Sequence, residues 1–157
     1  MRVRTPPRGR GASMVGMSDL GPKDASPDVR DEPDGILRVE VHGEVTEDRA
    51  RAVLGAIQRV SESGRDVLVL ADARHMGPVS AQARKAVTEE MRGARVDAVA
   101  IIGASFSMRV IMALLAKGVH MLTGQPYPQQ FFDTEGEAHA WLLTRRDALR
   151  AGRRPGT

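Results

Sequence analysis

The chain contains no cysteine among its 157 residues. Without thiols it cannot form disulfides, use a thiolate nucleophile, or bind zinc or an iron–sulfur cluster through cysteine. A composition without cysteine also fits a reducing compartment, so we expect a cytoplasmic protein.

Long hydrophobic runs are missing as well. Residues 1–11 are basic, but small residues, glycine and proline follow them in place of the apolar core of a signal peptide. The longest apolar stretch, residues 106–122, contains Arg109 and Lys117 and is shorter than the roughly 20 residues that span a bilayer. The sequence therefore predicts neither an export signal nor a transmembrane helix.

Aromatic residues are few, at 3% of the chain, and none is interleaved with the basic segments. The net charge of +3 is unevenly spread: residues 1–33 contribute +1, residues 34–143 contribute −2 and residues 144–157 contribute +4. The central part is therefore slightly acidic. Because the basic ends lack aromatic side chains that could stack on bases, we do not expect nucleic acid as a partner.

Three segments differ in composition. Residues 1–33 are rich in Pro, Gly, Ser, Asp and Arg and have no apolar period, so they cannot bury enough surface to offset the entropy of ordering. We expect a disordered leader over 1–33, one folded domain over 34–149 and a basic disordered tail over 150–157.

Strand and helix patterns alternate from Ile36 onward. Alternating or continuous apolar residues predict strands near 36–41, 67–70, 96–103 and 129–132. Apolar residues at helical spacing predict helices that begin near Thr46, Ser80, Ser105 or Ser107, and Thr134. This alternation is typical of an α/β domain with a mainly parallel sheet of four to five strands and about four helices, joined by right-handed crossovers.

Ligand sites in parallel sheets lie beyond the carboxyl ends of the strands. The candidate binding or phosphorylation residues at this rim are Asp72, His75, Ser80, Gly103, Ser105 and Ser107. Each serine lies near a helix N-terminus, where backbone N–H groups favour an anion or a phosphorylated hydroxyl, and where a serine also serves as a plain helix cap. Both interpretations stay open.

The motifs of catalysis are absent or incomplete. Ser105 follows Gly103, but Ser107 occupies the position where the nucleophile elbow of a hydrolase requires a second glycine. There is no glycine-rich phosphate loop or dinucleotide fingerprint, and the four histidines show no metal-ligand spacing. We therefore expect no enzyme activity, no cofactor and no metal.

The third predicted helix is apolar around more of its circumference than packing on a sheet requires. Apolar residues cover about 200° of it, whereas a stripe that faces a sheet needs just over about 100°. Its candidate interface or ligand face comprises Met108, Met112, Leu115 and Val119. The surplus has to be covered by the last helix, by an apolar ligand or by another subunit, and adaptable methionines suit the last two.

Four stretches of the chain resemble a known family. They are Val67-Leu-Val-Leu-Ala-Asp-Ala-Arg74, Pro78-Val-Ser80, Ala98-Val-Ala-Ile-Ile-Gly103 and Gln130-Phe-Phe-Asp-Thr-Glu-Gly-Glu-Ala-His-Ala-Trp-Leu142. Over residues 35–143 the chain resembles the bacterial SpoIIAA-like family of STAS-related domains. The resemblance implies a β/α fold without catalysis, related to anti-sigma factor antagonists and to apolar-ligand carriers of the CRAL-TRIO type.

Antagonists of that type carry Asp-Ser-Ser-Gly at the start of the second helix, and a partner kinase phosphorylates the first serine. Here Ser80-Ala-Gln-Ala83 occupies the motif, and Ala81 stands where the phosphoserine would be. The resemblance implies a non-catalytic STAS-like regulatory module that binds another protein or self-associates. The alternative is a carrier or sensor of a small, lipid-like apolar ligand held between the third and fourth helices and the sheet.

Overall fold

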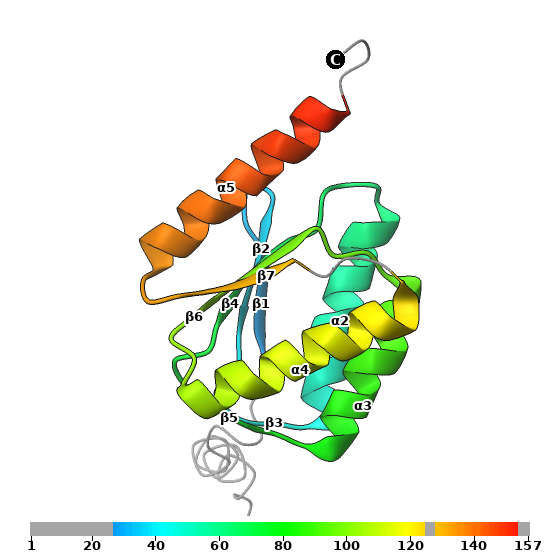
Figure 1. Ribbon diagram of the computed structural model, residues 1–157, viewed down its shortest axis with the longest axis vertical. Coiled ribbons are helices and arrows are strands. Elements are labelled where there is room, and N and C mark those ends of the chain that lie inside the picture. Colours follow the sequence, from blue (N-terminus) through cyan, green and yellow to red (C-terminus); the bar gives the residue numbers. More distant parts are fainter. Residues whose placement is uncertain (1–26, 125–127, 154–157) are drawn as a thin grey trace, which may run out of the picture.

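The computed structural model of the chain describes residues 27–124 and 128–153. The elements follow in the order β1 (Asp28–Asp31), β2 (Ile36–Glu40), β3 (Gly43–Val45), α2 (Glu47–Glu62), β4 (Leu68–Asp72), β5 (Met76–Val79), α3 (Ala81–Glu90), the short 3₁₀ helix η2 (Met91–Gly93), β6 (Ala98–Ile102), α4 (Phe106–Thr123), β7 (Gln129–Phe132) and α5 (Glu135–Gly152). Figure 1 shows their arrangement.

Five strands form the main sheet, in the order β1-β2-β4-β6-β7. β2, β4, β6 and β7 run parallel to one another, with Leu37 opposite Val69 and Val69 opposite Val99, whereas β1 is antiparallel to β2. β4 and β6 lie inside the sheet because their apolar runs allow both faces to be buried. The predicted α/β fold, with a mainly parallel sheet and four α-helices in the described residues, is confirmed.

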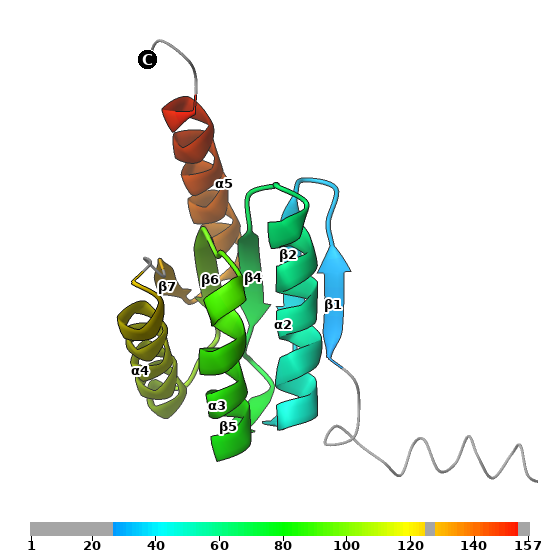
Figure 2. The same ribbon diagram turned by 90° about the vertical axis from the view of Figure 1, so that its right-hand side faces the viewer.

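The sheet separates two apolar cores. On one face, Val69 and Ile101 pack with residues of α2, α3 and α4. On the opposite face, Leu70 packs with Ala138 and Leu142 of α5. Successive residues of a strand point to opposite faces, so β4 and β6 supply both cores. Figures 1 and 2 show α5 on one side of the sheet and the other three helices on the opposite side.

β1 lies inside the segment 1–33 that composition predicted to be disordered. Asp28–Asp31 pairs with β2, and Arg65 donates to both carboxylate oxygens of Asp31 at 2.9 and 3.0 Å. The prediction was wrong for these residues because an edge strand is held by backbone hydrogen bonds and needs few apolar side chains. Residues 1–26 lie outside the described residues.

α5 is longer than the sequence indicated. It continues to Gly152, inside the segment 150–157 that was expected to be a disordered tail, and Arg153 donates to both oxygens of Asp66 at 2.7 and 3.0 Å. The helix extends because a bidentate ion pair ties its end to the loop before β4. Residues 154–157 lie outside the described residues.

A second, two-stranded sheet was not predicted. β3 and β5 pair in parallel, with Gly43 opposite Met76 and Val45 opposite Val79. A Cβ at Gly77 would lie 3.0 Å from the carbonyl carbon of Gly43, so a glycine permits this close approach. The two strands were not predicted because they are short and contain glycine and proline, which are typical of loops in a sequence.

Candidate functional site

A buried carboxylate organises the rim at the carboxyl ends of β2, β4 and β6. Asp72, the last residue of β4, is 1% exposed. Arg74 donates to it through Nε (2.9 Å to Oδ1) and Nη2 (2.6 Å to Oδ2), and Nη2 of Arg38 lies 3.6 Å from Oδ2. The side-chain hydrogen bonds from Arg74 lower the pKa of Asp72, although burial alone would raise it. Asp72 is therefore an ionised anchor for Arg74 at neutral pH.

Arg74 in turn covers Gly103, the residue that follows β6. Gly103 has a φ of 71°, a conformation that favours glycine, and a Cβ at this position would collide with Cγ of Arg74. The N–H of Gly103 donates to the carbonyl oxygen of Phe132 at 3.2 Å, which joins this part of the rim to β7. The Arg74 side chain therefore occupies the rim between β4 and β6.

His75 lies at the same rim and pairs with another histidine. Its ring stacks on that of His42, with centroids 4.8 Å apart and an interplanar angle of 17°, and Nε2 of His42 lies 2.8 Å from Oε2 of Glu40. Arg49, a buried residue of α2, donates to the backbone oxygens of His42 (2.8 Å) and Glu44 (2.7 Å). The buried guanidinium thus fixes the loop that carries His42.

Two of the three predicted rim serines cap helices. Oγ of Ser80 accepts a hydrogen bond from the N–H of Ala83 at 3.0 Å, and Oγ of Ser105 accepts one from the N–H of Met108 at 3.2 Å. Ser107 lies in the first turn of α4, with its Oγ 3.4 Å from that of Ser105. Of the two serines proposed to start this helix, Ser105 is therefore the cap. Ser80 is half-buried, whereas the other two serines are exposed.

The four residues predicted as an interface or ligand face lie on the inner side of α4. Met108 and Val119 are buried, and Met112 and Leu115 line a cavity between α4 and the sheet. All four therefore lie on the side of α4 that faces the core, although Met112 and Leu115 are only half-buried and Leu115 also borders a surface groove between α3 and α4.

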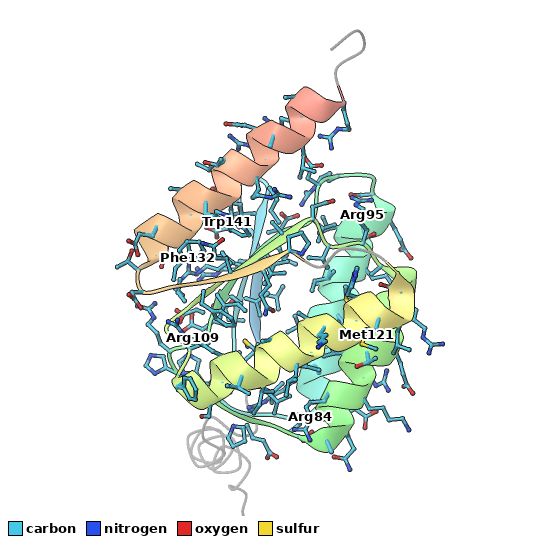
Figure 3. The ribbon with its side chains drawn as sticks, viewed as in Figure 1. Arg84, Arg95, Arg109, Met121, Phe132 and Trp141 are labelled. Carbon is cyan, nitrogen blue, oxygen red and sulfur yellow. The ribbon has the colours of Figure 1, made fainter. Side chains whose placement is uncertain are left out.

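Five large apolar side chains lie instead on the outer side of α4. Their exposed fractions are 83% for Phe106, 44% for Val110, 63% for Leu114, 73% for Met121 and 51% for Leu122. Among the described residues these are the exposed large hydrophobic side chains, so the patch is confined to one helix, on which Figure 3 labels Met121. We call these five residues the α4 outer face.

The last helix does not cover this face. α5 packs through Ala138 and Leu142 against β4 and β6, on the opposite side of the sheet. Phe132 and Trp141, with ring centroids 5.7 Å apart, lie between β7 and α5 on that side (Figure 3). The prediction of a ligand held between the third and fourth helices is therefore wrong in its position, because the sheet separates these two helices.

A partly open apolar cavity lies beneath α4 and is lined also by residues of β2, β4, β6, α2 and α3. This cavity has a volume of about 150 Å³. Its lining is apolar, as at Val41, Leu54 and Ile101, apart from Gln129, whose Nε2 donates to the carbonyl oxygen of Met112 at 3.2 Å. A cavity of this size and lining suits a small apolar group and disfavours a charged one.

The described residues contain one candidate membrane-spanning helix and no cluster of metal-binding side chains. Of the helices in the described residues, α4 alone is long and apolar enough to cross a membrane, with a mean hydropathy of 1.3 over Phe106–Thr123 and 11% of that segment buried. The core helix of a soluble protein meets the same two criteria. Residues 27–124 and 128–153 contain no group of three or more His, Asp or Glu side chains that could hold a metal ion.

Comparison with protein families decides the relationship of the chain. The sequence model of the family described as SpoIIAA-like matches residues 36–143. The chain belongs to the SpoIIAA-like family. The matched region begins at β2 and ends within α5, so this SpoIIAA-like domain includes both cores, the rim and the α4 outer face. No curated protein sequence matches the chain.

Solved structures share the SpoIIAA-like fold at low sequence identity. An uncharacterized protein of the DUF3478 family from Shewanella loihica PV-4 matches with a TM-score of 0.54 and 16% identity, over 74% of this chain and 92% of that one. The anti-sigma factor antagonist SpoIIAA in its unphosphorylated form matches with a TM-score of 0.52 and 11% identity, over 76% of this chain and 98% of that one. At sequence identities of 16% and 11%, these matches show that the chain shares its fold with the two proteins.

The sequence predicted the rim and the surplus apolar surface of α4. It did not predict the two arginines that hold the rim in place, or that the exposed apolar residues lie on the outer side of α4. Arg74 and Arg49 gave no signal, because their partners are a carboxylate and backbone oxygens that only the fold brings close. The outer face did leave a signal. Phe106, Val110 and Leu114 recur at every fourth position of a helix, which places them on one side.

Proposed function

We propose that this SpoIIAA-like domain is a non-catalytic regulatory module that binds another protein chain through the α4 outer face. The observation that carries the proposal is the exposure of Phe106, Leu114 and Met121 on a helix whose opposite side already contributes to the core. Monomeric soluble domains rarely expose contiguous apolar patches larger than a few hundred Å², and patches of that size are often binding sites. The fold supports the proposal, since one structural relative is an anti-sigma factor antagonist.

The chemistry of the rim favours binding over catalysis. A serine nucleophile needs a base within hydrogen-bonding distance. Within the described residues the hydroxyls of Ser80 and Ser105 accept capping hydrogen bonds from backbone N–H groups, and neither is bonded to a histidine. Asp72 is occupied by Arg74, so it does not orient His75 as the acid of a triad would.

The partner proposal is tested in cells with a photo-crosslinking amino acid placed at position 114. Ala52, an exposed residue of α2 on a different surface, provides the matched control position. We expect discrete higher-mass adducts after illumination at position 114 and none at position 52. Equal adduct patterns at the two positions, or no adducts at position 114, would contradict the proposal.

We further propose Ser80 as a residue through which a kinase regulates the module. Ser80 caps α3, where unpaired N–H groups and the helix dipole favour a phosphate. Incubation of the protein with ATP and a lysate of its source should add one phosphate, and Ser80→Ala should abolish it. A phosphate that persists in Ser80→Ala, or the absence of any phosphate, would leave Ser80 as a helix cap.

A second candidate function is the binding of a small apolar ligand, and the cavity beneath α4 favours it. The ligand would lie between α4, α2, α3 and the sheet, with Met112 and Leu115 against it. Native mass spectrometry of the protein purified from cells should then show an extra mass of roughly 100 daltons, the size that a cavity of about 150 Å³ admits, and denaturation should remove it. A native mass equal to one chain or to a whole multiple of it would reject a retained ligand.

A further inference from the structure

We infer that the partner of the α4 outer face is a second copy of the same chain, bound antiparallel across a two-fold axis that passes through Leu114. This inference rests on the proposed function, because it names the partner of the same surface. It follows from two observations, the positions of the side chains about Leu114 and the area of the face, and the sign of the charges beside the face provides a test.

Two residues of the outer face, Phe106 and Leu122, lie at equal distances before and after Leu114. In an antiparallel pair centred on this residue, a side chain eight positions before the centre meets one eight positions after it. Phe106 therefore meets Leu122 of the second copy, and Val110 meets Gly118. A Cβ at Gly118 would meet nothing within 4 Å, so there is room for the valine of the second copy. Val110 of each copy thus lies opposite the open space at Gly118 of the other copy.

The open space at Gly118 extends into a groove between α3 and α4. Ile111, Leu114, Leu115 and Gly118 line it from α4, and Arg84 and Thr88 line it from α3. The side chains at positions 110 and 114 of a second copy would point into this groove. The groove therefore adds contact area to the ridge that the outer face forms.

The exposed area suits a weak, concentration-dependent dimer. Complete burial of the outer face on both copies would remove on the order of 1,000 Å² of surface in total, which is in the range of weak, transient interfaces. A flat partner surface would leave the groove between α3 and α4 empty, whereas the outer face of a second copy would offer side chains to enter it.

Charge beside the face gives the inference a distinctive signature. α4 contains no Asp or Glu, and Lys117 lies three positions beyond the centre, so in the pair it approaches Ile111 and the nearby Arg84 of the other copy. Like charges therefore flank an apolar contact, and salt should strengthen the dimer by screening them. An acidic protein partner or an anionic lipid surface would show the opposite dependence.

The stoichiometry and the surface are tested by sedimentation of the full chain over a range of concentrations. We expect twice the mass of one chain, with Leu114→Asp raising the dissociation constant at least 100-fold because each dimer contains the substitution twice. Gly118→Leu, which fills the open space without adding charge, should also weaken the dimer. Ala52→Asp, which adds the same charge on another surface, should not.

The antiparallel geometry is tested with single cysteines, since the chain has none of its own. Leu114→Cys should form an intermolecular disulfide much faster than Ala52→Cys, because the two-fold axis brings the two sulfurs together. Phe106→Cys should not, since the two copies of position 106 would lie about 24 Å apart along the helix axis. A mixture of Phe106→Cys with Leu122→Cys should crosslink.

Three results would overturn the inference. They are a monomer at every concentration, a dimer that Leu114→Asp and Gly118→Leu leave unchanged, and disulfides of Phe106→Cys as fast as those of Leu114→Cys. A pure monomer that forms a photo-adduct with a different protein in cells would reject self-association and leave the proposed function standing. A pure monomer without any adduct at position 114 would reject both.

Discussion

At the scale of single residues, the rim depends on one carboxylate in the interior. Asp72 lies between Arg74 and Arg38, and Arg74 reaches across to cover Gly103. The pKa of Asp72 is lowered from its ordinary value of 3.8, chiefly by the hydrogen bonds from Arg74. A group with a lowered pKa stabilises the fold above its unfolded pKa, and this stabilisation is lost as the pH falls through the folded pKa.

Asp72→Asn removes that charge with little change in shape. We expect the free energy of unfolding at neutral pH to fall by about 1–2 kcal/mol, because charge-assisted hydrogen bonds are replaced by neutral ones. The difference from the wild type should be constant at neutral pH and should shrink as the pH falls below about 4. Denaturant unfolding at several pH values measures it.

Asp147→Asn is the matched control. Asp147 is 70% exposed and its contact with Arg146 is 3.5 Å long. Its substitution should change the free energy of unfolding by less than about 0.5 kcal/mol. Equal effects of the two substitutions would show that Asp72 contributes no more than a surface carboxylate.

Gly103 tests the contact with Arg74. Gly103→Ala and Gly64→Ala both place a Cβ at a positive φ, but a Cβ at Gly64 meets nothing within 4 Å, whereas at Gly103 it overlaps Arg74. We expect a loss of about 1 kcal/mol for Gly64→Ala and at least about 2 kcal/mol for Gly103→Ala, measured by thermal or denaturant unfolding. On an Arg74→Ala background the difference should shrink without vanishing, because Cβ and Cα of residue 74 would still lie 3.2 and 3.3 Å from the new Cβ. An unchanged difference would mean that the Arg74 side chain beyond Cβ does not cover Gly103.

At the scale of elements, α4 differs from α2 in how firmly it is attached. α2 buries six residues over its length, whereas α4 buries only Met108 and Val119 and lies above a cavity. α4 packs mainly against α3 and η2. Few buried contacts per turn favour local opening. Of these two helices, α4, which has the exposed apolar side chains, is therefore the less firmly anchored.

Hydrogen exchange of the backbone amides tests this difference. We expect the amides in the middle of α4 to exchange at least about tenfold faster than those in the middle of α2. The measurement is best made on Leu114→Asp, so that association does not add protection to α4. Protection of α4 equal to that of α2 would indicate that the cavity beneath it does not weaken its attachment.

The elements also show what the sequence could and could not predict. Periodicity located β2, β4, β6, β7 and all four helices, because each has a strong apolar pattern or a capping residue. β1, β3 and β5 were not predicted, because edge strands and short strands are held by backbone hydrogen bonds and have little apolar pattern in the sequence. For α4 the sequence did show more apolar surface than packing on a sheet requires. It could not show which apolar residues of α4 would be exposed to solvent, because that depends on how the helix lies over the sheet.

At the scale of the whole molecule, one sheet holds two cores together. Leu142 of α5 is fully buried on one face, and Leu54 of α2 is buried on the other. Because β4 and β6 contribute to both cores, neither helix layer can leave without exposing the strands that the other layer covers. The two sides should therefore unfold as a single unit.

The single tryptophan makes this prediction measurable. Trp141 reports the α5 side of the sheet, whereas the far-ultraviolet circular dichroism is dominated by all four helices. Leu54→Ala, on the side away from Trp141, should lower the free energy of unfolding by about 2–4 kcal/mol and shift both signals equally. A fluorescence transition that stays in place while the dichroism shifts would show that the two sides unfold independently.

The position of Met121 gives the module a chemical vulnerability. Met91 and Met108 are buried, whereas Met121 is 73% exposed at the C-terminal end of the α4 outer face. Of the methionines in the described residues, Met121 is therefore the one whose sulfur a mild oxidant should reach first, and it would become the polar sulfoxide, which reductases reverse. In a protein without a single thiol, oxidation of this methionine would weaken the proposed association while leaving the two cores intact.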